Sequence, residues 1–230
     1  MFKIAKGRIF MNILVFGDSI TYGYYDLKGG WAKRLYRLYN EDKKGSFKNF
    51  SLPGATSKDM IAQIKRAKDL NILDKDNFKV IFAYGINDSA TGFMDYISLD
   101  AFKENTIKII ELMNNYNLET IFVGLTIMDE SIEDGFGGLL FYSNESIGLY
   151  NEVLKKTCKQ FGIPFVDIYK HCLKEKDKYL SYLDDGIHPN ANGHKFILEE
   201  VLKVFPQFIN KTNQRILVDH IEISKKSEVD

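Results

Sequence analysis

The sequence predicts an α/β fold in which a parallel β-sheet is covered by helices on both faces. Short apolar segments typical of buried strands alternate with longer segments of helical periodicity. Several of the apolar segments end at a glycine or at a Pro-Gly pair, as strands do where the chain turns. The 230 residues, of which 45% are hydrophobic and 27% charged, suit a globular domain of this kind.

The first part of the chain supplies three predicted strands and two helices. Asn12–Phe16 is a short apolar run that reads as a buried strand, and Gly30–Tyr39 carries apolar residues at helical spacing. Lys48–Leu52 is a weaker strand that ends at a Pro-Gly pair. Ser57–Leu70 has a polar start suited to capping and one apolar face, which predicts a helix. Lys79–Tyr84 is a clear strand followed by glycine.

The second part continues the alternation. Leu99–Tyr116 is a long amphipathic helix, and Thr120–Leu125 is another buried strand. Asn144–Phe161 is predicted to be a helix that ends at a glycine, and Ile163–Ile168 to be the fifth strand. Five strands alternating with helices predict a parallel sheet with both faces buried.

The C-terminal part is predicted less fully. We expect the last helix, Asn192–Val204, to stop at Pro206, because proline disrupts a helix interior. Beyond Asn210 the chain is polar, with two short apolar stretches that fit either an edge strand or an oligomer contact, Ile216–Val218 and Ile221–Ile223. No linker or repeat divides the chain. We therefore expect one domain over residues 1–230, with its core at about 11–206 and a C-terminal extension at 207–230.

Composition argues against several classes of function. The 31 basic and 31 acidic residues cancel, so the chain has no overall field to attract nucleic acid. No apolar run approaches the roughly 20 residues of a membrane span, and the run Ile13–Phe16 is too short for a signal sequence. Cys158 and Cys172 have no metal-ligand spacing and read as reduced thiols. A cytoplasmic location is expected.

Ligands of open parallel sheets bind beyond the carboxyl ends of the strands. The segments that follow the predicted strands are therefore the candidates for chemistry: Gly17-Asp18-Ser19, Pro53-Gly54, Gly85-Ile86-Asn87-Asp88, the residues from Thr126 onward, and the loop Asp184–Pro189.

Ser19 is a candidate nucleophile. It follows a predicted strand and a glycine and falls near a helix start, where its backbone N–H is free to face an oxyanion. A serine hydroxyl needs a base to become nucleophilic. The alternative interpretation is that Asp18 or Ser19 only caps the helix.

Asp185 and His188 are the candidate base and its partner. With a loop loosened by Gly186, an aspartate three residues before a histidine can accept a hydrogen bond from imidazole Nδ1 and leave the other nitrogen to take a proton. Asp184 is a neighbour that competes for this role, and the spacing favours Asp185. The alternative is a surface loop rich in turn residues.

Gly54 and Asn87 are candidate oxyanion contacts. Glycine allows the backbone to approach a ligand closely, and an asparagine amide is an uncharged donor. Taken singly, each is equally well explained as a turn or cap residue.

Together these segments resemble the conserved blocks of the SGNH (GDSL-type) hydrolases. Gly17-Asp18-Ser19-Ile20 resembles the first block, Gly85-Ile86-Asn87-Asp88 the Gly-x-Asn-Asp block, and Asp185–Asn190 the terminal Asp-x-x-His block. Gly54 occupies the place of the glycine in the second block. The blocks follow the family's order, and the resemblance extends from about Asn12 to Phe205.

The resemblance implies a serine esterase or acylhydrolase with a flavodoxin-like three-layer α/β/α fold and a five-stranded sheet, without metal or cofactor. It implies that Ser19 attacks the acyl carbon, His188 is the base, and Asp185 orients it. It also implies an oxyanion hole formed by the N–H groups of Ser19 and Gly54 and by the side chain of Asn87. Pro53, which has no N–H, departs from the second block and makes Gly54 the weakest assignment.

The expected substrate is a small carboxylic ester, cleaved through an acyl-enzyme. O-deacetylation of a sugar and acyl transfer use the same residues and stay open, as does a homo-oligomer. A phosphatase using Asp18 lacks the second acid, because Ile20 stands two residues later. An inactive carbohydrate-binding module on this fold is disfavoured because every expected catalytic residue is present, and no nucleotide-binding glycine motif follows a strand.

Three further features allow two interpretations each. Aromatic side chains after Ser19 are either pocket-lining or packing residues, namely Tyr22, Tyr24, Tyr25 and Trp31. Asp134–Tyr142 is either a rim over the site or an ordinary surface loop. His171, His194 and His220 have no spacing that suggests metal binding and are expected to be structural. Asp88 and Thr21 are also expected to be structural, through turn and cap hydrogen bonds.

Overall fold

The computed structural model describes residues 11–40, 45–73, 78–92, 97–132 and 139–226, with side chains to Phe208. Its centre is a five-stranded sheet in the order β2-β1-β3-β5-β7, in which every pairing is parallel. The strands are β1 (Asn12–Gly17), β2 (Phe47–Asn49), β3 (Phe78–Ala83), β5 (Thr120–Val123) and β7 (Phe165–Val166). The predicted α/β class and parallel sheet are confirmed.

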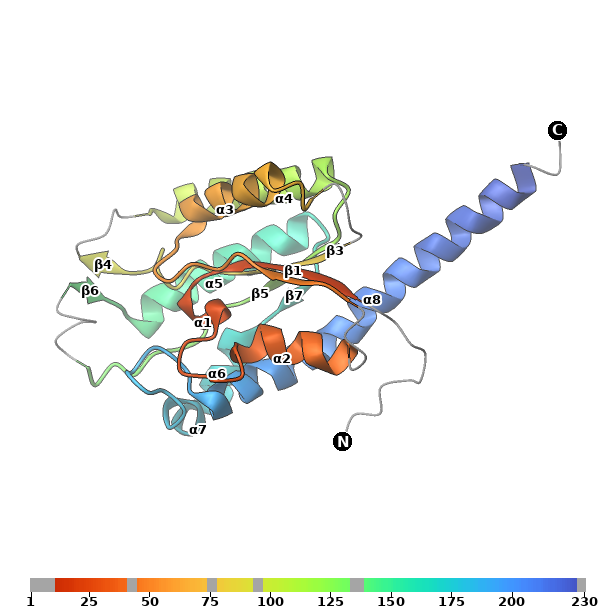
Figure 1. Ribbon diagram of the computed structural model, residues 1–230. Helices are drawn as coiled ribbons and strands as arrows, with labels where there is room; N and C mark the ends of the chain where they lie inside the picture. The colour runs from red at the N-terminus through yellow and green to blue at the C-terminus, as the bar shows by residue number, and fades with distance from the viewer. Residues whose placement is uncertain (1–10, 41–44, 74–77, 93–96, 133–138, 227–230) are drawn as a thin grey trace.

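Helices cover both faces of the sheet, which gives three layers (Figure 1). On one face α3 packs against α4 and α4 against α5, and on the other α2 packs against α8. The helices are α1 (Ser19–Tyr22), α2 (Gly30–Tyr39), α3 (Ser57–Asp69), α4 (Leu99–Asn115), α5 (Asn144–Gln160), α6 (Ile168–Lys174), α7 (Lys176–Leu180) and α8 (Ala191–Lys226). The strand order reverses between β1 and β3, so a ligand is expected beside the ends of these two strands.

The core is built on the central strands. Phe16 of β1, Phe82 of β3 and Phe122 of β5 are fully buried and stack in a row, with ring centroids 5.0 and 5.1 Å apart. Burying one such side chain stabilises the fold by roughly 1.5–3 kcal/mol. Since both faces of β1 and β3 are buried, the carboxyl ends of these strands are held in place, and so are the residues that follow them.

The edge strands are shorter than predicted because side chains turn the backbone there. The Asn49 side chain accepts a hydrogen bond from the Ser51 N–H and ends β2. Asp167 accepts one from the Lys170 N–H and starts α6, which restricts β7 to Phe165–Val166. The short helix α7 and a small antiparallel pair, β4 (Thr91–Gly92) with β6 (Leu140–Phe141), were not predicted.

The prediction that the last helix stops at Pro206 is wrong, because α8 continues through Pro206 to Lys226. Phe205 and Phe208 are buried on either side of the proline, so packing holds the helix where local preference would break it. The backbone at Ile216–Val218 and Ile221–Ile223 is helical, which excludes the predicted edge strand. Figure 1 shows the end of α8 extending beyond the sheet. An oligomer contact there stays a prediction.

In the described part of the chain, no helix combines the length and the apolar character needed to cross a bilayer. Cys158 and Cys172 are both buried, and burial raises the pKa of each thiol to about 12. Neither thiol is therefore a nucleophile near neutral pH.

Candidate active site

The structure brings Ser19, His188 and Asp185 together beyond the carboxyl end of β1. Ser19 Oγ lies 2.7 Å from His188 Nε2, and His188 Nδ1 lies 2.7 Å from Asp185 Oδ2. Because the aspartate can only accept, Nδ1 carries the proton and Nε2 accepts from the serine hydroxyl. Ser19 and His188 are only 5% and 6% exposed, so bulk water competes little for these hydrogen bonds. The arrangement can generate a serine nucleophile.

The loop that carries Asp185 and His188 is held by its own hydrogen bonds. Asp185 Oδ1 accepts from the N–H groups of Ile187 at 3.1 Å and His188 at 2.8 Å. Burial alone would raise the pKa of Asp185, but the hydrogen bonds from the His188 backbone and imidazole lower it below the ordinary value. The carboxylate therefore stays ionised beside the imidazole. Asp184, the competing partner, is exposed.

Gly186 allows this loop to form. Its φ of +84° lies in the left-handed region that favours glycine, and a Cβ at this position would lie 1.9 Å from Ile132 Cδ1. The left-handed backbone of Gly186 thus allows the loop that brings Asp185 back to His188, whereas the end of the exposed Ile132 side chain could move aside.

Ser19 is the first residue of α1, so its backbone N–H has no acceptor within the helix. The Asp18 side chain caps this helix by accepting from the N–H groups of Ile20 and Thr21. Thr21 donates its hydroxyl to the carbonyl of Ala83 and ties α1 to the end of β3. The turn after β1 is thereby fixed, and the N–H of Ser19 is left for a ligand.

Gly54 lies in a turn between β2 and α3. The Ala55 N–H donates to the Leu52 carbonyl at 3.1 Å, and Gly54 has a φ of +77°, as at the third position of a type II turn. Pro53 then occupies the second position, where proline is favoured. The departure at Pro53 therefore shapes the turn and does not remove the N–H of Gly54 itself.

Asn87 follows β3 and is buried. Its Nδ2 donates to the Ala55 carbonyl at 2.9 Å, and its Oδ1 accepts from the Tyr142 hydroxyl at 3.1 Å. An amide nitrogen has two hydrogens, so the second one is available to a ligand. Next to it, the Asp88 carboxylate accepts from the Ser57 N–H and fixes the start of α3. Asp88 and Thr21 are thus structural, as expected.

Asp18, which precedes the candidate nucleophile in the sequence, is also buried. Burial raises the pKa of its carboxyl to about 7, although the backbone hydrogen bonds of Thr21 and Ile20 oppose the shift. A small cavity lies beside it, lined by residues at the ends of β1, β3 and β5 that include Thr21, Ala83 and Thr126.

Asp18→Asn is expected to reduce the dependence of stability on pH, with a part left by the buried Asp88, whose pKa burial raises to about 6. Because the folded-state pKa of about 7 exceeds the unfolded value, the folded protein holds the proton more tightly, and its free energy of unfolding falls as pH rises from about 4 to about 7. This loss is roughly 1.4 kcal/mol for each unit of pKa shift. Asparagine keeps the capping oxygen and removes the titration. Urea unfolding at both ends of this range measures the difference; an unchanged difference in the variant would refute a raised pKa.

Three of the tyrosines after Ser19 are exposed, while Trp31 is buried and acts in packing. The rings of Tyr24 and Tyr25 lie 5.3 and 6.0 Å from the His188 ring, centroid to centroid. These two side chains therefore form part of the surface next to the candidate base, whereas Tyr22 packs edge-on against Tyr24.

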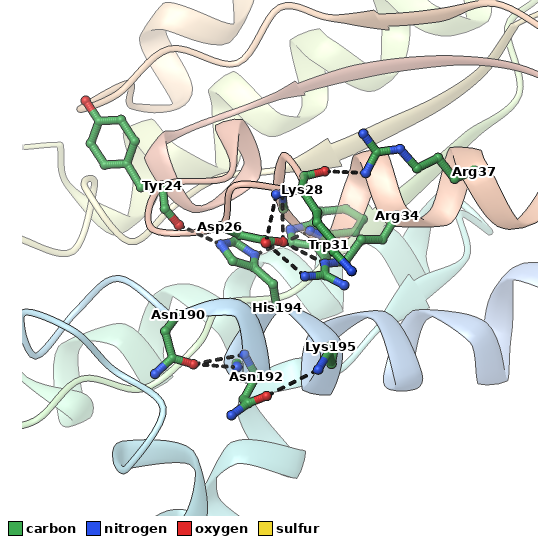
Figure 2. A network of polar contacts seen from close by, with 12 residues as sticks. Tyr24, Asp26, Lys28, Trp31, Arg34, Arg37, Asn190, Asn192, His194 and Lys195 are labelled. Carbon is green, nitrogen blue, oxygen red and sulfur yellow. Dashed lines mark hydrogen bonds and ion pairs between the residues drawn. The ribbon is translucent and has the colours of Figure 1, made fainter.

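A buried polar network, which the sequence did not predict, holds the segment that contains Tyr24 (Figure 2). His194 Nε2 donates to the Tyr24 carbonyl at 2.9 Å, and its Nδ1 accepts from the Trp31 N–H. The Asp26 carboxylate accepts two hydrogen bonds from the Arg34 guanidinium, at 2.6 and 2.8 Å. Burial alone would raise the pKa of Asp26, but the ion pair with Arg34 lowers it to about 2. His194 is thus structural, as expected.

The other two histidines were also expected to be structural. His171 lies 3.1 Å from a carboxylate oxygen of Glu200. The side chain of His220 lies outside the described residues. Across residues 11–208, with their gaps, no group of three or more His, Cys, Asp or Glu side chains is placed to hold a metal ion.

Part of the predicted rim, Asp134–Tyr142, lies outside the described residues, which resume at Leu139. There β6 pairs with β4, so this segment reaches back over the loop that follows β3. The hydrogen bond from the Tyr142 hydroxyl to Asn87 Oδ1 was not predicted from the sequence. The sequence indicated a possible rim over the site here but not the contact of Tyr142 with Asn87.

The chain is similar to known proteins over most of its length. A model of the GDSL-like lipase/acylhydrolase family matches residues 15–196. The isoamyl acetate-hydrolyzing esterase of Saccharomyces cerevisiae is 26% identical, over 90% of this chain and 93% of the relative. A GDSL esterase/lipase of Oryza sativa subsp. japonica is 24% identical, over 90% and 81%.

Solved structures show the same fold. A lipolytic protein of the G-D-S-L family from Veillonella parvula has a TM-score of 0.66 at 22% identity, covering 85% of this chain and 98% of its own. An acetylxylan esterase from Geobacillus stearothermophilus has a TM-score of 0.66 at 16% identity, covering 86% and 95%.

Proposed function

Since this chain belongs to the GDSL-like lipase/acylhydrolase family and is a carboxylic ester hydrolase, we propose that it cleaves short-chain esters through an acyl-enzyme on Ser19. The observation that carries the proposal is the continuous hydrogen-bonded chain from Asp185 through His188 to Ser19, with 2.7 Å at both links. A hydroxyl held in this way loses its proton to the imidazole as it attacks.

In the first step Ser19 Oγ bonds to the acyl carbon while His188 Nε2 takes its proton. The carbonyl oxygen becomes negative and accepts from the N–H groups of Ser19 and Gly54 and from Asn87 Nδ2. His188 then gives the proton to the leaving alcohol oxygen, and the ester bond breaks. Water repeats the sequence on the acyl-enzyme, releases the acid and restores the serine. The lowered pKa of Asp185 supports an ionised carboxylate that stabilises the imidazolium throughout.

An acetyl or similarly short acyl group is the substrate class we favour. The yeast relative, 93% of whose length is matched, carries acetate hydrolysis in its name. O-deacetylation of a sugar is the second candidate. It is favoured by the exposed rings of Tyr24 and Tyr25 beside His188, the residue that delivers a proton to the leaving alcohol. Aromatic side chains of this kind can pack against the ring of a sugar.

A series of para-nitrophenyl esters tests the acyl preference. We expect kcat/KM to be highest for acetyl to octanoyl esters and to fall for palmitoyl esters. A preference for palmitoyl esters would contradict the proposal. Acetylated xylo-oligosaccharides and ethyl acetate, compared at equal enzyme concentration, separate the two candidates: a higher kcat/KM for the sugar would favour O-deacetylation.

A further inference from the structure

Tyr142 lies where the segment after β5 returns to the site, immediately after β6. It is half-buried, and its hydroxyl donates to Asn87 Oδ1 at 3.1 Å. Tyr142 therefore holds the oxygen of the same amide whose nitrogen is the proposed oxyanion donor.

The orientation of this amide decides whether it can act. An asparagine can rotate by half a turn and exchange its oxygen and nitrogen. In the observed orientation Nδ2 donates to the Ala55 carbonyl and Oδ1 accepts from Tyr142. In the reversed orientation Oδ1 would face the Ala55 carbonyl, and both would be acceptors. The Ala55 carbonyl thus decides which end of the amide is the nitrogen, because a tyrosine hydroxyl can either donate or accept. The hydrogen bond from Tyr142 to Oδ1 holds the amide in that orientation and leaves the second hydrogen of Nδ2 for the developing charge.

The backbone around Tyr142 is attached to the loop that carries Asn87. On one side β6 pairs with β4, with Phe141 opposite Thr91. On the other side the Ser146 hydroxyl donates to the Ser89 carbonyl at 2.8 Å. With attachments before and after it, Tyr142 is fixed relative to Asn87.

The tyrosine also remains a donor over the working range of pH. Burial, with smaller contributions from the charges of Asp18 and Asp185, raises the pKa of Tyr142 to about 12. Its hydroxyl is therefore protonated at any pH at which the imidazole can act as a base.

We propose that Tyr142 is a positioning residue for the oxyanion hole, and that its hydroxyl, together with the Ala55 carbonyl, holds the Asn87 amide with Nδ2 toward the negative charge of the transition state. This inference rests on the proposed function, in which Asn87 is an oxyanion donor. A hydrogen bond to an amide oxygen also polarises the amide and strengthens its N–H as a donor. Because the charge develops only in the transition state, the effect belongs to kcat rather than to KM.

A double-mutant cycle with Tyr142→Phe and Asn87→Ala tests the inference. Asn87→Ala is expected to lower kcat by about 10²–10³, as for other oxyanion donors. Tyr142→Phe, which keeps the ring, is expected to lower kcat by about tenfold, the equivalent of one hydrogen bond, with KM unchanged. The double variant is expected to match Asn87→Ala alone, because the tyrosine acts through the asparagine.

Tyr36→Phe is the matched control: this half-buried tyrosine donates to the Gly45 carbonyl at 2.7 Å and should keep wild-type kcat. Thermal melting of each variant checks that it is folded. If Asn87→Ala keeps wild-type kcat, the proposed oxyanion role is wrong. If Asn87→Ala is impaired but Tyr142→Phe has wild-type kcat, or if the two effects multiply in the double variant, the inference about Tyr142 is overturned.

Discussion

Ser19→Ala is expected to lower kcat by on the order of 10⁶, the effect of removing the nucleophile from a comparable triad. The substitution removes the oxygen that lies 2.7 Å from His188 Nε2, so no acyl-enzyme can form. The fold should persist, since the Asp18 cap of α1 and the hydrogen bond from Thr21 to Ala83 do not involve the Ser19 hydroxyl. Initial rates on para-nitrophenyl acetate, with a thermal melting curve, measure both properties.

Ser51→Ala is a suitable control for this variant. Ser51 is buried to the same degree as Ser19, and its hydroxyl has no hydrogen-bond partner within the described part of the chain. It should retain turnover. A folded Ser19→Ala protein with wild-type turnover would mean that Ser19 is not the nucleophile.

Asp185→Asn is expected to lower kcat by on the order of 10⁴, as the equivalent change does in other serine triads. The amide removes the negative charge that stabilises the imidazolium, and it allows the wrong histidine tautomer. The other carboxylate oxygen also accepts from the N–H groups of Ile187 and His188, which an asparagine oxygen can still do. The loop should therefore keep its shape, and the loss should appear in kcat.

Asp184→Asn is the matched comparison. It removes a charge from an exposed side chain that is the immediate neighbour of Asp185 in the sequence. It should keep near-wild-type kcat. If Asp184→Asn lost activity and Asp185→Asn did not, the orienting role would pass to Asp184.

The parts of the fold that were predicted from sequence are those in which periodicity and burial agree. The central strands β1, β3 and β5 are continuous apolar runs, and α2 carries a clear apolar face. Where one side chain redirects the backbone, as Asn49 and Asp167 do, the ends of strands were placed wrongly. At Pro206 the burial of Phe205 and Phe208 prevailed over the local preference of proline, which no local pattern predicts.

In the site, too, the residues marked by local patterns could be predicted and the contacts made by tertiary packing could not. Ser19, Asp185 and His188 stand in short local motifs at positions that a parallel sheet brings to one edge, so their proximity could be predicted. The contact of Tyr142 with Asn87 joins residues 55 positions apart, and that of His194 with Tyr24 joins residues 170 apart. Such contacts depend on how loops fold over the sheet, and no spacing in the sequence encodes them.

The measurement that tests the central claim most directly is the intact mass of the protein after treatment with a fluorophosphonate, followed by peptide mapping. Such a reagent forms a stable adduct with a serine only where a base activates it. We predict one adduct per chain, on Ser19, and none in a folded His188→Ala variant. An unlabelled wild-type protein, or an adduct on a different serine, would contradict the assignment of Ser19 as the activated nucleophile.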